Sequence, residues 1–192
     1  MSMDLSEALA IVAANRQHRI VIPTMGAISV WPMLSDQALD FYYMPSSMGQ
    51  GPALGLGLAL AQPEKGVIVL CGDGSLLMNL GCLVTVAQHP ANLWLILLDN
   101  GQYEITGGQP VPMSGRINYA LLAQGAGLPR AYSFESHEVW KAEAPAVFAG
   151  QGPVFVWLKL TPRAGQKTPT PPRPMAEQIQ RLQCALAINS PP

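Results

Sequence analysis

Short, uninterrupted apolar runs alternate along the chain with longer segments of helical periodicity, and this alternation limits the fold more than any other feature. The clearest runs are GVIVLC at 66–71 and NLWLILL at 92–98. Strands that are apolar almost throughout are typical of parallel sheets, because helices cover both faces of such sheets. Strands that alternate with helices form βαβ units. We therefore predict an α/β fold: a doubly wound, mainly parallel sheet with helices on both faces.

The same patterns place the other elements. Further strands are expected at 19–23, 40–44 and 153–160. Helices are expected at 5–15, 49–62, 76–88, 117–127, 136–150 and 175–187. The glycines and prolines of 101–113 predict a loop, and the prolines of 161–174 predict an extended strap. A chain of 192 residues is long enough for one domain, so we assign 1–160 to a ligand-binding domain and 161–192 to a strap and closing helix of the same domain.

The predicted helix at 49–62 contains glycines at positions 55 and 57. Glycine inside a helix costs about 1 kcal/mol relative to alanine. Small residues are kept at such a cost where another element packs very close to the helix. We therefore expect this helix to lie tightly against a neighbour.

The composition excludes several kinds of partner. Charged residues make up only 12% of the chain, against about 25% in an ordinary soluble domain, so part of the surface is expected to be buried against another chain. A net charge of −1 gives no basic footprint for nucleic acid. No apolar stretch approaches the ~20 residues that cross a bilayer, and no basic segment opens the chain as in an export signal. We expect a cytoplasmic protein, with all three cysteines present as buried thiols.

A turn with ligand-binding character follows the first of the two apolar runs. Its residues are Gly72, Asp73, Gly74 and Ser75, and a helix is predicted to follow them. The glycines permit a tight turn and a close approach to a ligand. The helix N-terminus adds free N–H groups at the same place. A carboxylate beside such N–H groups indicates a site for a divalent metal and a phosphate.

The predicted strand that contains the second apolar run ends at Asn100, one helix and one strand after Asp73. Ligands of open parallel sheets collect at the carboxyl ends of the strands, so the two side chains are expected side by side. Mg²⁺ takes six oxygen ligands in octahedral array. Asp73, the amide oxygen of Asn100 and the carbonyl oxygen of Gln102 are the predicted metal ligands.

The pair of motifs GDGS at 72–75 and LLDN at 97–100 resembles the cofactor-binding motif of the thiamine diphosphate-dependent enzymes. In those enzymes the Asp, the Asn and a carbonyl two residues later hold Mg²⁺. Within the family the chain is most similar to the β subunits of sulfopyruvate decarboxylase and to the C-terminal half of phosphonopyruvate decarboxylase. The likeness spans about 5–187 and is carried by SMGQGPALGLGLALA, GDGSLLMNLGCL and DNGQYEITGGQP. The resemblance implies a thiamine diphosphate-binding domain over 1–160, with the cofactors thiamine diphosphate and Mg²⁺.

The resemblance also assigns roles residue by residue. Met48 stands where the family has an apolar wedge that bends the cofactor, and Ser46 and Ser47 precede it. Thr24 and Gly26 follow the first predicted strand, where the family makes further diphosphate contacts. The full set of implied cofactor contacts is Thr24, Gly26, Ser46, Ser47, Met48, Gly72, Asp73, Gly74, Ser75, Asn100, Gln102 and Tyr103.

The candidates for catalysis are fewer. In the related pyruvate decarboxylases an acidic residue six positions after the metal-binding Asn assists the reaction. Here Thr106 stands at that position and Glu104 lies two positions before it, so both are candidates beside Met48. Arg116 follows the loop predicted at 101–113, which begins directly after the metal-binding Asn100 and which we call the metal loop. It either meets an anionic group of the substrate or forms a surface salt bridge.

Thiamine enzymes use a second domain, which grips the pyrimidine and supplies an activating glutamate. This chain has no residue that matches that glutamate. The resemblance thus implies the β subunit of a heteromeric 2-oxoacid decarboxylase, with its active site shared with a separate pyrimidine-domain (α) subunit and a small 2-oxo acid as substrate. The expected assembly has two copies of each chain or a multiple, and the chain alone is expected to be inactive.

Two alternatives remain open. The same cofactor also serves carboligases and oxidative 2-oxoacid enzymes, which need an acceptor site or a redox partner. A non-catalytic nucleotide-binding or regulatory module is the other alternative, although the chain has neither GxGxxG after its first predicted strand nor GxxxxGK[ST].

Overall fold

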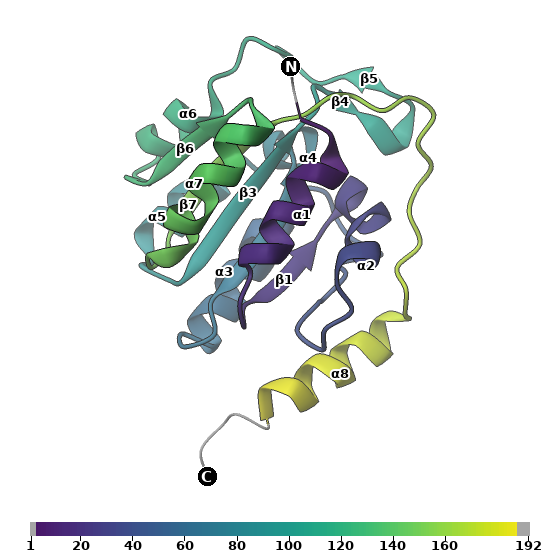
Figure 1. The fold of residues 1–192 in the computed structure, drawn as a ribbon, viewed down its shortest axis with the longest axis vertical. Helices are drawn as coiled ribbons and strands as arrows, with labels where there is room; N and C mark the ends of the chain where they lie inside the picture. The colour runs from purple at the N-terminus through teal and green to yellow at the C-terminus, as the bar shows by residue number, and fades with distance from the viewer. Residues whose placement is uncertain (1–2, 188–192) are drawn as a thin grey trace.

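A sheet of five parallel strands forms the centre of the computed structural model, which describes residues 3–187 (Figure 1). The strands are β1 (Ile20–Pro23), β2 (Val67–Gly72), β3 (Leu93–Asp99), β6 (Ala131–Phe134) and β7 (Val154–Lys159). Their order across the sheet is β1-β2-β3-β7-β6, and every neighbouring pair is parallel. The central strands β2 and β3 are buried along almost their whole length, as their apolar sequences predict.

Helices cover both faces of this sheet. On one face lie α1 (Leu5–Asn15), the short α2 (Trp31–Leu34) and α7 (His137–Ala149), which pack on side chains such as Ile68 and Leu70. On the other face lie α3 (Gly51–Ala61), α5 (Cys82–Gln88) and α6 (Tyr119–Gly125), which pack on Val67 and Val69. Because successive strand residues point to opposite faces, each strand feeds both layers of core. The predicted doubly wound α/β fold is confirmed.

The helix predicted at 76–88 is in fact two helices. The first, α4 (Asp73–Leu77), begins at the motif itself, and α5 begins at Cys82. Between them Asn79 donates a hydrogen bond from Nδ2 to the carbonyl oxygen of Gly49, 3.1 Å away. This long-range bond stabilises the turn that separates the two helices. Helical periodicity in the sequence does not predict such a turn.

The strand predicted at 40–44 does not form. Val21 of β1 makes an isolated parallel bridge with Asp40, and the residues that follow continue without a strand. The segment still runs beside β1, because the N–H groups of Phe41 and Tyr43 donate to the carbonyls of Val21 and Pro23. Side chains take some of its other polar groups: the backbone N–H of Tyr42 donates to Gln178 Oε1 at 2.8 Å, and Asp40 binds Arg16. Conversely, β6 was not predicted, because AYSF is a short edge strand whose central residues, Tyr132 and Ser133, are exposed.

The loop predicted at 101–113 contains short regular pieces, namely β4 (Gln102–Tyr103), the 3₁₀ turn η2 (Glu104–Thr106) and β5 (Gln109–Pro110). Another 3₁₀ turn, η1 (Met25–Ser29), follows β1. The β4–β5 pair and the start of the strap lie together at one end of the molecule in Figure 1.

The strap runs from β7 to the closing helix α8 (Met175–Ala187), as predicted, and descends along one side of the molecule in Figure 1. Asp36 anchors its far end through Arg173 and Arg181, and Leu182 is buried against the rest of the protein. Cys71 and Cys82 are buried as expected, but the expectation is wrong for Cys184, which is exposed on α8. Among the described residues, no helix is both long and apolar enough to span a membrane.

Candidate functional site

One pocket lies where β1, β2 and β3 end. It gathers residues from the turn after β1, the segment before α3, the β2–α4 turn, the β3–β4 loop and the start of the strap. Twelve of the fourteen residues assigned to cofactor binding or catalysis line it: Thr24, Gly26, Met48, Gly72, Asp73, Gly74, Ser75, Asn100, Gln102, Tyr103, Glu104 and Thr106. The other two, Ser46 and Ser47, precede Met48 and are not part of the lining.

Asp73 lies deepest among the predicted metal ligands, with only 1% of its surface exposed. Its Oδ2 accepts a hydrogen bond from the backbone N–H of Gly101 at 2.9 Å, and the same N–H lies 3.2 Å from Asp99 Oδ1. Burial, with the nearby Asp99 carboxylate as a second cause, raises the pKa of Asp73 to about 7. Asp99 is held in place by Trp157, whose Nε1 donates to its Oδ2 at 2.8 Å. A cation beside Asp73 would stabilise its ionised form and so lower this raised pKa.

The pocket brings Asp73 together with further oxygen-bearing groups of the kind that Mg²⁺ binds. Asn100 Oδ1 accepts from the N–H of Gln102 at 3.2 Å, which folds the loop so that the amide oxygen and the Gln102 backbone belong to one tight turn. Within 3–187 no cluster of three or more His, Cys, Asp or Glu side chains could hold a metal. A metal held by the predicted ligands would take one carboxylate together with amide and carbonyl oxygens, which are hard ligands of the kind Mg²⁺ prefers.

Met48 is tied to the β2–α4 turn through its neighbour Gly49. The N–H of Gly49 donates to Ser75 Oγ at 2.8 Å, and its carbonyl accepts from Asn79. Gly49 has φ +83°, and a Cβ there would lie 2.7 Å from Asn79 Cβ, so only glycine fits this approach. The half-buried Met48 side chain is thereby fixed at the pocket wall. Ser46 Oγ is buried without a hydrogen-bond partner among the described residues.

Glu104 and Thr106 lie on the η2 turn in different surroundings. Thr106 is exposed and its Oγ1 donates to the carbonyl of Tyr103 at 3.4 Å. Glu104 is buried and binds Arg163, whose Nη2 lies 2.9 Å from Glu104 Oε2. Both side chains reach the pocket, and the catalytic role predicted for them remains a prediction.

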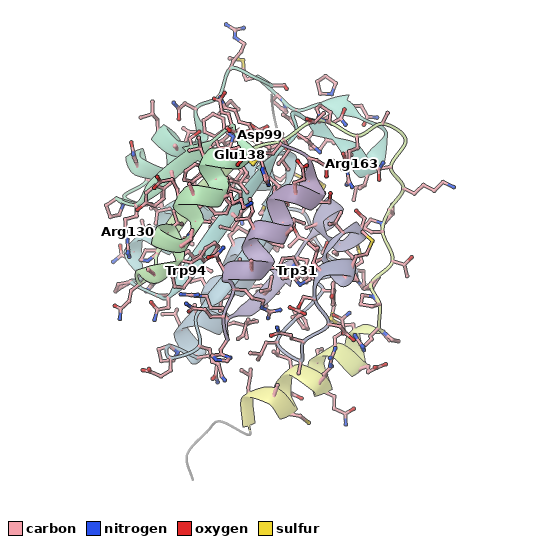
Figure 2. The ribbon with its side chains drawn as sticks, in the orientation of Figure 1. Trp31, Trp94, Asp99, Arg130, Glu138 and Arg163 are labelled. Atoms are coloured by element: carbon pink, nitrogen blue, oxygen red, sulfur yellow. The ribbon has the colours of Figure 1, made fainter. Side chains whose placement is uncertain are left out.

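Arg163 is the functional candidate that the sequence reasoning missed. It stands on the strap four residues after β7 ends and lines the pocket. Arg116, for which the sequence leaves both an anion contact and a surface salt bridge open, is exposed and lies outside this lining. Figure 2 labels Arg163 and Asp99 toward the same end of the molecule. The rule that ligands collect at the carboxyl ends of strands applies to β7 as well as to β2 and β3. Applied there, it points to Arg163.

Comparison with known proteins agrees with this site. The family model described as "Thiamine pyrophosphate enzyme, C-terminal TPP binding domain" matches residues 23–158, thiamine pyrophosphate being another name for thiamine diphosphate. The chain is 44% identical over 110 residues to sulfopyruvate decarboxylase subunit beta of Methanothermobacter thermautotrophicus, covering 57% of this chain and 59% of that protein. It is 32% identical over 173 residues to phosphonopyruvate decarboxylase of Streptomyces viridochromogenes, covering 90% of this chain and 43% of that protein.

A solved structure shares the fold. Benzoylformate decarboxylase of Polynucleobacter necessarius superimposes with a TM-score of 0.73 at 16% identity, over 86% of this chain and 34% of that one. The chain thus spans less than two thirds of the length of each of these three proteins. The match of the family model covers most of the described chain and includes both motifs of the pocket. This chain therefore belongs to the thiamine pyrophosphate enzymes, through their C-terminal, cofactor-binding domain.

Proposed function

We propose that the chain binds Mg²⁺ and thiamine diphosphate in this pocket and is the β subunit of a heteromeric 2-oxoacid decarboxylase. The observation that carries the proposal is the convergence of Asp73, Asn100, Gln102 and Met48 on one pocket. The names of the two relatives support the finer assignment. Both are decarboxylases of a 2-oxo acid that carries a sulfonate or phosphonate group, and the sulfopyruvate enzyme is named as a beta subunit. The separate α subunit would complete the active site.

Each part of the pocket has a defined task in this proposal. Asp73, Asn100 and the Gln102 carbonyl hold Mg²⁺, and the Gly74–Ser75 backbone faces the diphosphate. Tyr103 packs on Gly74, where a Cβ would lie 2.5 Å from Tyr103 Cε1. This contact keeps the metal loop against the β2–α4 turn, so both halves of the site share one geometry. When bound, thiamine diphosphate supplies the electron sink that decarboxylation of a 2-oxo acid requires.

The apolar wall of the pocket has a task of its own. Leu5, Met25, Leu98, Ile105 and Leu160 line the pocket beside its polar groups. Apolar walls exclude water and so strengthen the electrostatic interactions inside a site. In the complex, the α subunit would close the side of the pocket that this chain leaves open.

Calorimetric titration tests the proposal. Thiamine diphosphate should bind in the presence of Mg²⁺ and lose affinity in EDTA, while ATP and NAD⁺ should not compete. Asp73→Ala should abolish the Mg²⁺-dependent binding with the fold intact by circular dichroism. Glu64→Ala, which removes an exposed carboxylate away from the pocket, is the matched control and should bind normally. Unchanged affinity in Asp73→Ala would refute the metal assignment.

The reaction itself is tested with the complete complex. A decarboxylase should release one CO₂ and one aldehyde for each 2-oxo acid consumed. A carboligase would instead join the aldehyde fragment to a second carbonyl compound. Product analysis after incubation with sulfopyruvate, phosphonopyruvate and pyruvate therefore separates the proposed reaction from its closest alternative.

A further inference from the structure

The pocket contains one positive side chain. Of the described residues that line it, Arg163 is the only lysine or arginine, beside the carboxylates of Asp73 and Glu104. About 23% of the Arg163 side chain is exposed, against 6% for Glu104, so a ligand in the pocket can reach the guanidinium. In the proposed function this pocket takes up an anionic cofactor and an anionic substrate, so the guanidinium lies where it could meet either of them.

Arg163 is held in one position by both its backbone and its side chain. Its backbone N–H donates to Glu104 Oε1 at 3.0 Å, and its carbonyl accepts from Gln102 Nε2 at 3.2 Å. The side chain donates from Nε to Glu104 Oε1 at 3.2 Å and from Nη2 to Glu104 Oε2 at 2.9 Å. Such a two-pronged pair fixes the plane of the guanidinium.

The remaining edge of the guanidinium is available to a ligand. Its hydrogen bonds to the described residues use Nε and Nη2, with Ser29 Oγ a further partner of Nη2 at 3.4 Å. The N–H groups of Nη1 make none of these bonds. Gly26 lies directly beside the pair, since a Cβ there would be 3.1 Å from Glu104 Oε2 and 3.7 Å from Arg163 Nη2.

We propose that Arg163 is the anion-binding residue of the pocket, oriented by Glu104 to bind a tetrahedral oxyanion. Guanidinium groups bind phosphate and sulfonate oxygens through parallel N–H donors. This inference rests on the proposed function, which offers two sources of such an oxyanion. One is the diphosphate of the cofactor, and the other is the phosphonate or sulfonate group of the substrate. In either case Glu104 is a positioning residue that also moderates the positive charge.

A purely structural role for the Arg163–Glu104 ion pair predicts a different result when either residue is replaced. If the pair only ties the strap to the metal loop, then breaking it from either side should impair binding in the same way. If Arg163 binds an anion, the two sides should act in opposite directions. Arg163→Gln removes the positive charge and should weaken anion binding. Glu104→Gln keeps the shape and one acceptor oxygen but removes the competing charge, so it should strengthen anion binding.

The first experiment measures the affinity of the full chain for Mg²⁺–pyrophosphate, Mg²⁺–thiamine diphosphate and unphosphorylated thiamine. A charge-assisted hydrogen bond contributes enough that Arg163→Gln should lose about tenfold or more in affinity for the first two ligands, with thiamine unaffected. Arg173→Gln is the matched control, because Arg173 lies on the same strap but pairs with Asp36 outside the pocket. It should bind like the wild type.

The second experiment identifies the substrate as the source, if the first shows no loss for Arg163→Gln. In the complete complex, Arg163→Gln should then raise KM about tenfold or more for phosphonopyruvate or sulfopyruvate and leave KM for pyruvate unchanged. Unchanged binding and unchanged KM, or shifts in the same direction for Arg163→Gln and Glu104→Gln, would overturn the anion-binding role. A wild-type chain that binds pyrophosphate through Arg163 but no thiamine diphosphate would instead refute the proposed function and leave the anion site standing.

Discussion

At the scale of single residues, Asp73 combines a structural cost with the metal-binding role that we propose for it. It is buried next to a second carboxylate, and its pKa of about 7 shows that the folded protein resists its ionisation. A divalent cation reverses this preference, because it stabilises the charged form. The side chain proposed to hold the metal is therefore expected to destabilise the metal-free protein.

Asp73→Asn should expose this cost in metal-free protein. The pKa of Asp73 rises from 3.8 to about 7 on folding, so between these pH values the folded protein holds a proton that the unfolded chain has lost. The wild type's free energy of unfolding should therefore fall as pH rises from about 4 to about 7. Asparagine does not titrate, so in EDTA the variant should gain Tm over the wild type at pH 8, by roughly 2–4 °C for each kcal/mol, and gain little at pH 4.

Calorimetry at both pH values checks this result. Added Mg²⁺ and thiamine diphosphate should raise the Tm of the wild type and not that of Asp73→Asn. A Tm difference that is equal at pH 4 and pH 8 would show that Asp73 does not carry the titration.

Met48 is the second residue with a separable role. If it is the wedge under the cofactor, Met48→Ala should lower kcat by roughly 10- to 100-fold, because small misplacements of reacting groups are costly. The Kd for thiamine diphosphate should change much less. Parallel measurements of kcat in the complex and of Kd decide the point, with Met33→Ala, an exposed methionine outside the pocket, as control. Equal losses in kcat and affinity would favour ordinary core packing.

At the scale of elements, the close approach expected for the glycine-containing helix is present, but at one glycine only. A Cβ on Gly55 of α3 would lie 2.3 Å from Val69 Cγ2 of β2, whereas a Cβ on Gly57 would meet nothing within 4 Å. The tight packing places α3 against the strand that leads into the Asp73 turn. Helical periodicity predicts the helix, and only the contact with β2 tells the two glycines apart.

Alanine at these two positions should therefore have opposite effects. Gly57→Ala should stabilise the protein by up to about 1 kcal/mol through helix propensity. Gly55→Ala should destabilise it by about 1–3 kcal/mol, because the added methyl overpacks the contact with Val69. Urea unfolding measures both variants under the same conditions. The same sign for both would contradict the packing of α3 on β2.

At the scale of the whole molecule, the pocket is assembled from segments that are far apart in the chain. The turn after β1, the two motif turns and the start of the strap all contribute to it. The strap is held at both ends by ion pairs, through Glu104 at the pocket and through Asp36 beside α8. The strap thus links the pocket to the closing helix α8, which packs on the opposite end of the molecule in Figure 1.

The isolated chain should bind cofactor but show no turnover. The proposal assigns the metal, diphosphate and wedge positions to this chain and the activating glutamate to the separate α subunit, and a positioned proton partner is what general acid–base catalysis requires. We would assay CO₂ release from sulfopyruvate, phosphonopyruvate and pyruvate with thiamine diphosphate and Mg²⁺, first with this chain and then with a pyrimidine-domain subunit added. Substantial turnover by the chain alone would refute the two-subunit proposal.

The sequence by itself determined the βαβ architecture and the meeting of Asp73 with Asn100 at one pocket. Both depend on short-range patterns, since apolar strands followed by turn residues place polar side chains at the same edge of a parallel sheet. The tertiary structure alone decided the rest. In the segment expected as a strand, the N–H of Tyr42 donates to Gln178 and Asp40 binds Arg16. Arg163 pairs with a glutamate 59 positions away in the chain. These contacts join distant segments, so no local pattern encodes them.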